Sequence, residues 1–316
     1  MNTRINYPTR VHVELTSKCN FKCYTCKHGY VNYGTDISDK VVDVILNELL
    51  PNLQEIELQG TGESLLFPKF VNFFSKLSNN SMLKKTLITN ASLLTDEIID
   101  LFVNNKMDLI ISLDGTSPDI FSLNRPKGDF NKIIENLSKV GAKRRLANNP
   151  NFSFIINMVA TQENYKCIMD LIDLAKDIQI DYVHISEVRE CMPDTNVWNK
   201  LRLDNYVNRK EFEEYIDECK EYSQKNNIGF LFNKYQKSYM IKKPICKSPW
   251  QHVFIDSDGR VSFCCEQNKY FGNLNEQSFD EIWNGVQANQ FRNDMLLNEY
   301  DEICCNCCLP WGITYD

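Results

Sequence analysis

The chain has 316 residues, 43% hydrophobic and 24% charged, a composition that suits a globular protein with one large and one small domain. No run of about 18 apolar residues occurs, which argues against a membrane span. The formal net charge of −7 disfavours a broad nucleic-acid-binding surface, so nucleic acid is not an expected partner.

Over about the first 235 residues, short β-branched runs alternate with amphipathic segments, the pattern of βα units around a parallel sheet. Six strands are predicted: Val11–Leu15, Gln54–Leu58, Thr86–Thr89, Leu109–Leu113, Ser153–Val159 and Tyr182–Ile185. Helices are expected over Asp39–Leu50 after Ser38, Asp96–Asn104 after Thr95, and Ile133–Val140 after Asp129. This order predicts an α/β fold, a partial (β/α)6 TIM-like barrel, in which ligands bind at the carboxyl ends of the strands.

Three cysteines, Cys19, Cys23 and Cys26, follow the first predicted strand with C-x3-C-x2-C spacing. Three thiolates on so short a loop can hold three corners of a cubane iron–sulfur cluster, whereas a closed [4Fe–4S] site normally uses four. One iron would stay free to bind another molecule, as catalytic metal sites keep a position open. Zinc is the alternative, although it prefers four ligands and other spacings. Residues 1–15 contain no apolar run typical of a signal peptide, so we expect a reducing, cytoplasmic location and no disulfide framework.

This loop resembles the cluster loop of radical S-adenosylmethionine (SAM) enzymes. In that family the free iron binds SAM, an electron from the cluster cleaves the sulfonium, and the 5′-deoxyadenosyl radical abstracts a substrate hydrogen. The resemblance implies a [4Fe–4S] cluster and SAM as cofactors and an electron donor such as flavodoxin or ferredoxin as a partner. One position departs from the family, because Thr25 stands where an aromatic residue usually precedes the third cysteine.

The segment GTGESLL after the second predicted strand resembles the family's glycine–glycine–glutamate motif, which holds the SAM amino group. Gly62 and Glu63 match the motif, and Thr61 replaces its first glycine. Taken alone, glycines after a strand are mostly turns. The resemblance therefore rests on the order of the motifs along the chain.

Later strand ends also resemble SAM-binding positions of the family. The residues implied to contact the cofactor are Asn90 after the third strand, Ser112 and Asp114 at the end of the fourth strand, and Arg125. The guanidinium of Arg125 could bind the SAM carboxylate through two N–H groups. Asn157 resembles a further strand motif. The plainer interpretations are that Asn90 turns the chain and that Asp114 caps a helix. His184 is interpreted as a packed strand residue.

The tail holds seven of the thirteen cysteines, from Cys246 onward, which indicates a second metal site. A hairpin at Asp258-Gly259 is expected to bring Cys246 and Cys264 toward one site. The tail resembles the SPASM domain or its shorter twitch form, which implies an auxiliary [4Fe–4S] cluster. The other two ligands of this cluster would be a pair near the end of the chain. Cys304 and Cys307 are favoured because their C-x-N-C sequence matches the family, and Cys305 and Cys308 are the alternative. Cys265 would then not be a ligand. Zinc stays the alternative for this site.

A composition shift near Lys234 predicts a core domain over residues 1–234 and an auxiliary-cluster domain over residues 235–316. We expect a radical SAM oxidoreductase in which the auxiliary cluster helps to oxidise a small polar metabolite, such as a sugar or aminocyclitol alcohol. Only eighteen residues precede Cys19, too few for a leader-peptide-binding domain in front. The alternatives are a peptide maturase or epimerase, with Cys191 as a hydrogen donor in the epimerase, and a zinc-binding interaction module without catalysis.

Overall fold

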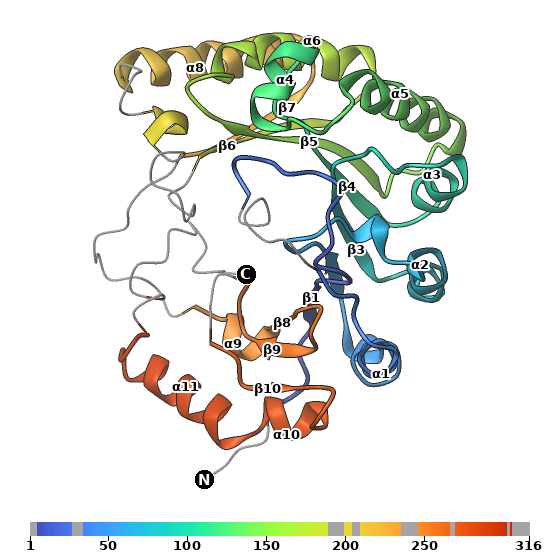
Figure 1. The fold of residues 1–316 in the computed structure, drawn as a ribbon, viewed down its shortest axis with the longest axis vertical. Coiled ribbons are helices and arrows are strands. Elements are labelled where there is room, and N and C mark those ends of the chain that lie inside the picture. The colour runs from blue at the N-terminus through green and yellow to red at the C-terminus, as the bar shows by residue number, and fades with distance from the viewer. Residues whose placement is uncertain are drawn as a thin grey trace. The chain divides into compact units, whose positions relative to one another are not determined.

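The computed structural model describes residues 5–26, 34–188, 199–203, 209–234, 246–265, 269–301 and 304 (Figure 1). The chain forms two compact units, each assembled from separate stretches of sequence. Unit 1 comprises Met1–Lys18, Thr35–Lys85 and Gln236–Asp316, and unit 2 comprises Cys19–Gly34 and Thr86–Tyr235. The cysteine-rich tail is thus grouped with the first two strands.

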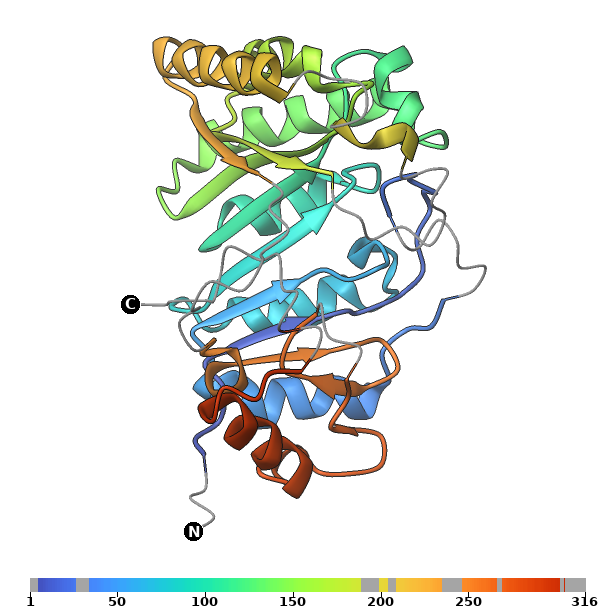
Figure 2. The ribbon, with the colours of Figure 1, turned by 90° about the vertical axis from the view of Figure 1, so that its left-hand side faces the viewer.

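The sheet of unit 1 has the order β10-β9-β8-β1-β2. Its strands are β1 (Arg10–Val13), β2 (Glu55–Leu58), β8 (His252–Ile255), β9 (Arg260–Ser262) and β10 (Gly272–Asn273). β1 is parallel to both of its neighbours, β2 and β8. The predicted hairpin is confirmed: β8 and β9 are antiparallel, and Gly259 in their turn has a φ of +82°, which glycine adopts without strain. Figure 2 shows this orange hairpin beside the dark blue β1.

Short helices complete unit 1. They are α1 (Asp39–Val44), which continues as a π-helical turn (Ile45–Leu49) and a 3-10 turn (Leu50–Asn52), a 3-10 turn (Ser64–Leu66), α2 (Phe70–Ser78), α9 (Ser248–Gln251), α10 (Phe279–Trp283) and α11 (Val286–Leu296). The side chain of Ser38 caps α1 as predicted, by accepting the Val41 N–H. The helix expected over Asp39–Leu50 is therefore present, but its second half is wider than an α-helix.

Unit 2 contains the strands β4 (Met107–Ser112), β5 (Phe152–Ala160), β6 (Tyr182–Glu187) and β7 (Gly229–Asn233), and β3 (Lys84–Thr89) runs into it from unit 1. β4 to β7 pair in parallel throughout. The helices of this unit are α3 (Asp96–Val103), α4 (Pro118–Asn124), α5 (Phe130–Ala147), a 3-10 turn (Tyr165–Cys167), α6 (Ile168–Asp177) and α8 (Arg209–Lys225). Figure 1 shows α3, α5, α6 and α8 along one face of these strands.

The burial pattern explains this layering. Residues of β4 and β5 alternate strictly between fully buried and half-buried, because successive side chains point to opposite faces of a sheet. The helices bury their apolar stripes, as in α3, where Ile98, Ile99 and Phe102 are buried. Thr95 and Asp129 cap α3 and α5 as predicted. In the described parts of the chain, no helix combines the length and apolarity that a bilayer crossing requires.

Candidate functional site

The base of the cysteine loop is closed by a ladder of contacts in unit 1. Thr16 and Asp36 form an antiparallel bridge, and the Thr16 hydroxyl donates to Asp36 Oδ1 at 2.7 Å. Lys18 Nζ lies 2.7 Å from Asp36 Oδ2, and the Thr35 N–H donates to Ser17 Oγ at 2.8 Å. These contacts bring the two ends of the loop together at a defined spacing.

The predicted motif residues Gly62 and Glu63 lie against this base. The Glu63 N–H donates to the carbonyl of Lys18, the residue before Cys19, at 2.8 Å. A Cβ atom at Gly62 would lie 2.2 Å from the Thr16 carbonyl oxygen, so only glycine fits there. The Glu63 side chain is buried, and its carboxylate accepts the Leu65 N–H at 3.2 Å. The motif is therefore built into the start of the cysteine loop.

A buried carboxylate that sequence reasoning missed, Glu14, joins the same motif to the tail hairpin. Its Oε2 accepts the N–H of Thr61 at 2.6 Å and the hydroxyl of Thr61 at 2.8 Å. Its Oε1 accepts the Ser257 hydroxyl at 2.8 Å. The available signal was a carboxylate inside the predicted strand Val11–Leu15, between the apolar residues Val13 and Leu15. Glu14 thus links three segments of unit 1 that lie far apart in the sequence.

Within unit 2, the loop itself is held by the end of β3. Asn90 Nδ2 donates to Asn20 Oδ1 at 2.9 Å, and Asn20 Nδ2 donates to the Ser92 hydroxyl at 2.8 Å. The predicted site residue Asn90 is therefore next to the cysteine loop. Its amide positions Asn20, the residue after Cys19, and a direct contact with SAM remains a prediction.

The other side of the loop packs against α4 and the segment after it. The Tyr24 N–H donates to the Asn124 carbonyl at 3.0 Å. Phe21 is buried, and a Cβ atom at Gly128 would lie 2.4 Å from the ring of Phe121 and 2.9 Å from that of Phe21. The close approach of these groups fixes the loop between Cys19 and Cys26.

The side chains of the three predicted ligands, Cys19, Cys23 and Cys26, are neither fully buried nor fully exposed. Burial raises the pKa of Cys23 to about 11, and the positive charge of Arg125 acts against this rise. The Phe21 N–H donates to Cys19 Sγ at 3.4 Å. Among the described residues, no three Cys, His, Asp or Glu side chains converge closely enough to hold a metal ion in this arrangement. A set of three thiols with a neighbouring guanidinium nevertheless has the donor chemistry that an anionic iron–sulfur cluster requires.

The guanidinium of Arg125 is anchored by Asp114. Arg125 Nε lies 2.8 Å from Asp114 Oδ2, and Asp114 Oδ1 accepts the Val159 N–H at 2.9 Å. Burial acts to lower the pKa of Arg125, but the adjacent carboxylate outweighs it and raises that pKa. Both oxygens of Asp114 thus accept from protein donors, and Ser112, at the end of β4, stays half-buried. The geometry makes Asp114 the support of Arg125, and its contact with SAM remains a prediction.

Asn124, the last residue of α4 and directly before Arg125, has a fully buried side chain. Neither its amide nitrogen nor its amide oxygen has a hydrogen-bond partner. An unpaired buried polar group costs about 1–3 kcal/mol, so such a group points to a ligand that would satisfy it. Sequence reasoning missed this residue, although it directly precedes the predicted Arg125.

Polar side chains line the half-buried face of three strands of unit 2. Asn157 of β5 is paired in register with His184 of β6, and Ser186 of β6 with Asn233 of β7. Asn233 Nδ2 donates to His184 Nε2 at 2.7 Å, and the Ser186 hydroxyl donates to Asn157 at 3.4 Å. Burial lowers the pKa of His184, so the ring is neutral at neutral pH. His184 is a half-buried residue of β6 and belongs to this polar face.

The tail places two predicted cluster ligands at the same end of a hairpin. Phe254 pairs with Ser262, and continuing that antiparallel register sets Cys264 opposite His252, shortly after Cys246 and α9. The His252 ring nitrogen Nδ1 lies 2.9 Å from the Phe263 carbonyl. Cys246, Cys264 and Cys304 are partly exposed and Cys265 is exposed. Cys191, Cys305, Cys307 and Cys308 lie outside the described residues.

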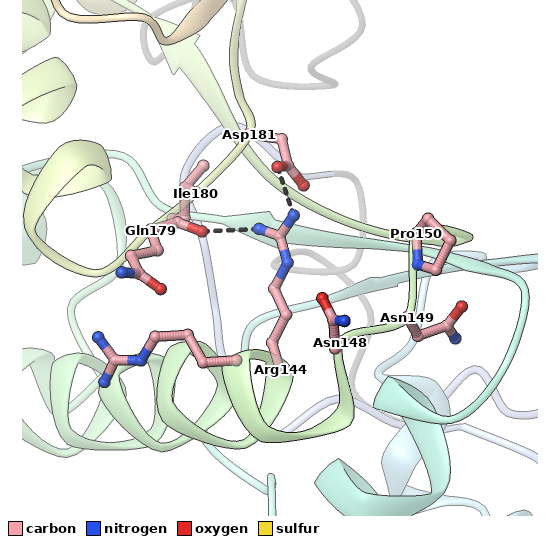
Figure 3. Close-up of a pocket in the computed structure, with 8 residues that line it drawn as sticks. Arg144, Asn148, Asn149, Pro150, Gln179, Ile180 and Asp181 are labelled. Carbon is pink, nitrogen blue, oxygen red and sulfur yellow. Dashed lines mark hydrogen bonds and ion pairs between the residues drawn. The ribbon is translucent and has the colours of Figure 1, made fainter.

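A cavity of about 390 Å³ in unit 2 lies away from these residues (Figure 3). Its lining comes from the segments that lead into β5 and β6, at their amino ends. Arg144 crosses it to donate to the Gln179 carbonyl at 2.8 Å and to Asp181 at 2.5 Å. Because ligands of parallel α/β folds bind at the carboxyl ends, we interpret this cavity as structural.

Comparison with protein families matches two regions. The radical SAM superfamily matches residues 13–175, slightly more than half of the chain. An iron–sulfur cluster-binding domain, SPASM, matches residues 246–308, which contain the predicted auxiliary ligands.

Curated relatives have different activities. A GTP 3′,8-cyclase of Synechocystis is 29% identical over 186 residues, 57% of this chain and 54% of the cyclase. The chain thus spans about half of that protein. A protein of Pyrococcus furiosus that modifies the cofactor of tungsten-containing aldehyde ferredoxin oxidoreductase is 24% identical over 89% of this chain and 82% of its own length. An AdoMet-dependent heme synthase of Methanosarcina barkeri is 22% identical over 96% of this chain and 91% of its own length.

Solved structures share the fold. Streptococcus suis SuiB bound to S-adenosylmethionine aligns with a TM-score of 0.67 and 17% identity, over 89% of this chain and 66% of SuiB. Native anSMEcpe with bound AdoMet aligns with a TM-score of 0.64 and 18% identity, over 90% of this chain and 82% of its own. These similarities confirm the predicted α/β fold class with a C-terminal SPASM domain.

Proposed function

The chain belongs to the radical SAM superfamily, and its two domains imply SAM and two [4Fe–4S] clusters as cofactors; from this premise we propose that the enzyme is an oxidoreductase acting on a small polar molecule. The proposed substrates are alcohols of the sugar or aminocyclitol class. A small electron-transfer protein such as a flavodoxin or a ferredoxin would supply the reducing electron.

The polar face of β5, β6 and β7 is the observation that carries this proposal. Asn157, His184, Ser186 and Asn233 offer amide, imidazole and hydroxyl groups side by side near the carboxyl ends of parallel strands. Ligands of parallel α/β folds bind at these ends, and hydrogen-bonding groups select substrates that carry matching hydroxyl or amino groups. An apolar substrate could not exchange hydrogen bonds with these groups and is therefore disfavoured.

The residues near the cysteine loop would bind the cofactors. Cys19, Cys23 and Cys26 would hold the first cluster, and Arg125, fixed by Asp114, would offer its remaining N–H groups to the SAM carboxylate. Glu63 would accept the SAM ammonium, and Asn124 has an amide free to bind a polar part of the ligand. When bound, the cluster and SAM together supply a carbon radical that removes a hydrogen atom from the substrate.

The oxidation of an alcohol to a ketone removes two hydrogens. The carbon-bound hydrogen leaves as an atom and forms the C–H bond of 5′-deoxyadenosine. The hydroxyl hydrogen leaves as a proton, and one further electron leaves the substrate, for which the auxiliary cluster is the proposed acceptor. His184 is neutral, and its Nε2 accepts from Asn233; this nitrogen would accept the proton once the substrate hydroxyl replaces Asn233 as its hydrogen-bond donor.

The test is to incubate the anaerobically reconstituted enzyme with SAM, a reductant and a panel of polyols, aminocyclitols and peptides. We expect a polyol or aminocyclitol to stimulate 5′-deoxyadenosine formation and to give a ketone, with deuterium transfer from the labelled carbon into 5′-deoxyadenosine. His184→Gln and Asn233→Ala should reduce this stimulation without changing SAM cleavage in the absence of substrate. Stimulation by peptides alone would contradict the proposed substrate class.

A further inference from the structure

Arg292, in α11, is a buried arginine in the SPASM domain, and its partners among the described residues are all neutral. It is 2% exposed. Its Nε donates to the Pro249 carbonyl at 2.6 Å, and one terminal nitrogen donates to the Trp283 carbonyl at 2.6 Å and to Asn289 Oδ1 at 3.1 Å. The second terminal nitrogen is buried without a hydrogen-bond partner. No carboxylate in the described parts of the chain contacts this guanidinium.

Two aromatic rings cover the guanidinium. Its central carbon lies 4.4 Å from the ring centre of Trp283 and 4.6 Å from that of Phe263. The two rings meet edge-on at 5.4 Å, and the faces of aromatic rings attract a cation. Burial lowers the pKa of Arg292 to about 10, so the group still carries its positive charge at neutral pH. A buried charge without an ionic partner is costly and is normally compensated.

Two of the contacts of Arg292 lie on the segments that carry predicted cluster ligands. Pro249 is three residues after Cys246, and Phe263 directly precedes Cys264. Arg292 therefore joins the segment before β8 to the segment after β9, in addition to the contact between His252 and the Phe263 carbonyl. It holds both segments from one side while keeping an unused N–H donor.

We propose that Arg292 is the cation that balances the auxiliary cluster and positions two of its ligand segments. A cluster held by thiolates is an anion, and its reduction adds one negative charge. A nearby buried cation stabilises the reduced form more than the oxidised form and so raises the reduction potential. The uncompensated charge, the unpaired donor and the two ligand-bearing segments then have one explanation. The proposal concerns the SPASM cluster alone and does not depend on which substrate the enzyme oxidises.

The experiment is a redox titration followed by electron paramagnetic resonance. The chain would carry alanine at Cys19, Cys23 and Cys26, so that the auxiliary cluster is observed alone. Arg292→Met removes the charge and keeps a long side chain. We expect its potential to fall by at least about 59 mV, a tenfold change in a one-electron equilibrium. An unchanged potential in a variant with full iron content would overturn the proposal.

Arg260→Met is the matched control. Arg260 lies in the same domain and also covers a ring, that of Tyr270 at 4.5 Å, but it is half-exposed and paired with Asp256 and Asp258. Its replacement should leave the potential unchanged. If Arg292→Met fails to take up iron, the Arg292→Lys variant replaces it in the test. Lysine keeps the positive charge, so this variant should bind the cluster with a reduction potential near that of the parent protein. A lysine variant that also lacks the cluster would show that shape, and not charge, is required, and would contradict the proposal.

Discussion

Arg125 and Asp114 form a buried ion pair, with Arg125 Nε 2.8 Å from the carboxylate and Asp114 fully buried. The charge of Arg125 also acts on the thiol of Cys23. The pair therefore connects the end of β4 electrostatically with the cysteine loop. Removing one partner would leave the other as an unpaired buried charge, which is costly.

Asp114→Asn should lower the free energy of unfolding by about 3–5 kcal/mol, the range for breaking a buried pair. Arg125→Met should cost a similar amount, and the double variant should lose less than the sum. Urea unfolding of all four proteins measures this coupling. The control is the pair Arg144 and Asp181, which is partly exposed and should show a coupling of about 0–1 kcal/mol. Additive losses at Asp114 and Arg125 would contradict the pairing.

Replacing Cys19, Cys23 and Cys26 together by alanine should remove the first cluster. The parent should bind about eight irons per chain, four for each cluster, and the variant about half of them. SAM cleavage should be abolished, because the proposed auxiliary cluster has four protein ligands and therefore no iron that can bind SAM. Iron analysis and chromatography of 5′-deoxyadenosine measure both effects. Cys167→Ala, at an isolated buried thiol, should keep both. Full SAM cleavage by the triple variant would reject the assignment.

Glu63→Ala should weaken SAM binding by about 1.5–3 kcal/mol, the range for a lost hydrogen bond to a charged group. Anaerobic titration calorimetry gives the affinity. Glu57→Ala, on β2 of the same unit, is the control and should bind SAM normally. An affinity equal to that of the parent would show that the motif does not hold the SAM ammonium in this chain.

Cys246→Ala combined with Cys264→Ala should abolish product but keep some uncoupled formation of 5′-deoxyadenosine. The reason is that the auxiliary cluster serves only the second half of the proposed oxidation. Metal binding also contributes to the folding of small cluster domains, so lower solubility is expected. Normal turnover by this double variant would favour a redox-neutral reaction over an oxidation.

His252 makes stability depend on pH. Burial lowers its pKa from 6.5 to about 4, with smaller contributions from His12 and Arg10. The unfolded chain therefore binds more protons between these values, and stability falls as the pH drops from 6.5 towards 4. The loss should reach about 3 kcal/mol, because one pKa unit corresponds to 1.36 kcal/mol. Urea unfolding at neutral pH and at pH about 4 measures it. His252→Gln should flatten this dependence, and an equally steep fall in the variant would assign it to other groups.

Local patterns were sufficient to predict most elements of the fold. All six predicted strands are present, because their apolar runs and alternation are local features, and Ser38, Thr95 and Asp129 cap helices as expected. β7 was not predicted, since its five residues follow α8 almost directly. The pairing of β8 with β1 joins residues more than two hundred positions apart, and no local pattern indicates such a partner.

In the candidate site, too, some residues could be predicted from local sequence patterns and others could not. The cysteine motif and Arg125 were visible as residue types at known spacings. The buried residues Glu14, Asn124 and Arg292 were not predicted, because their roles depend on contacts with distant segments. A buried charged or amide side chain has no sequence signature that distinguishes it from an exposed one.

The parallel pairing of β1 with β8 has a consequence for how the protein is made. β1 is synthesised well before β8, but in the described part of the chain one of its two hydrogen-bonding edges is covered by residues His252–Ile255. Until these residues have left the ribosome, that edge is open to pairing with other chains, as exposed edge strands are. We therefore expect nascent or truncated chains that lack β8 to depend on chaperones, and a tail deletion to aggregate instead of yielding a smaller folded core.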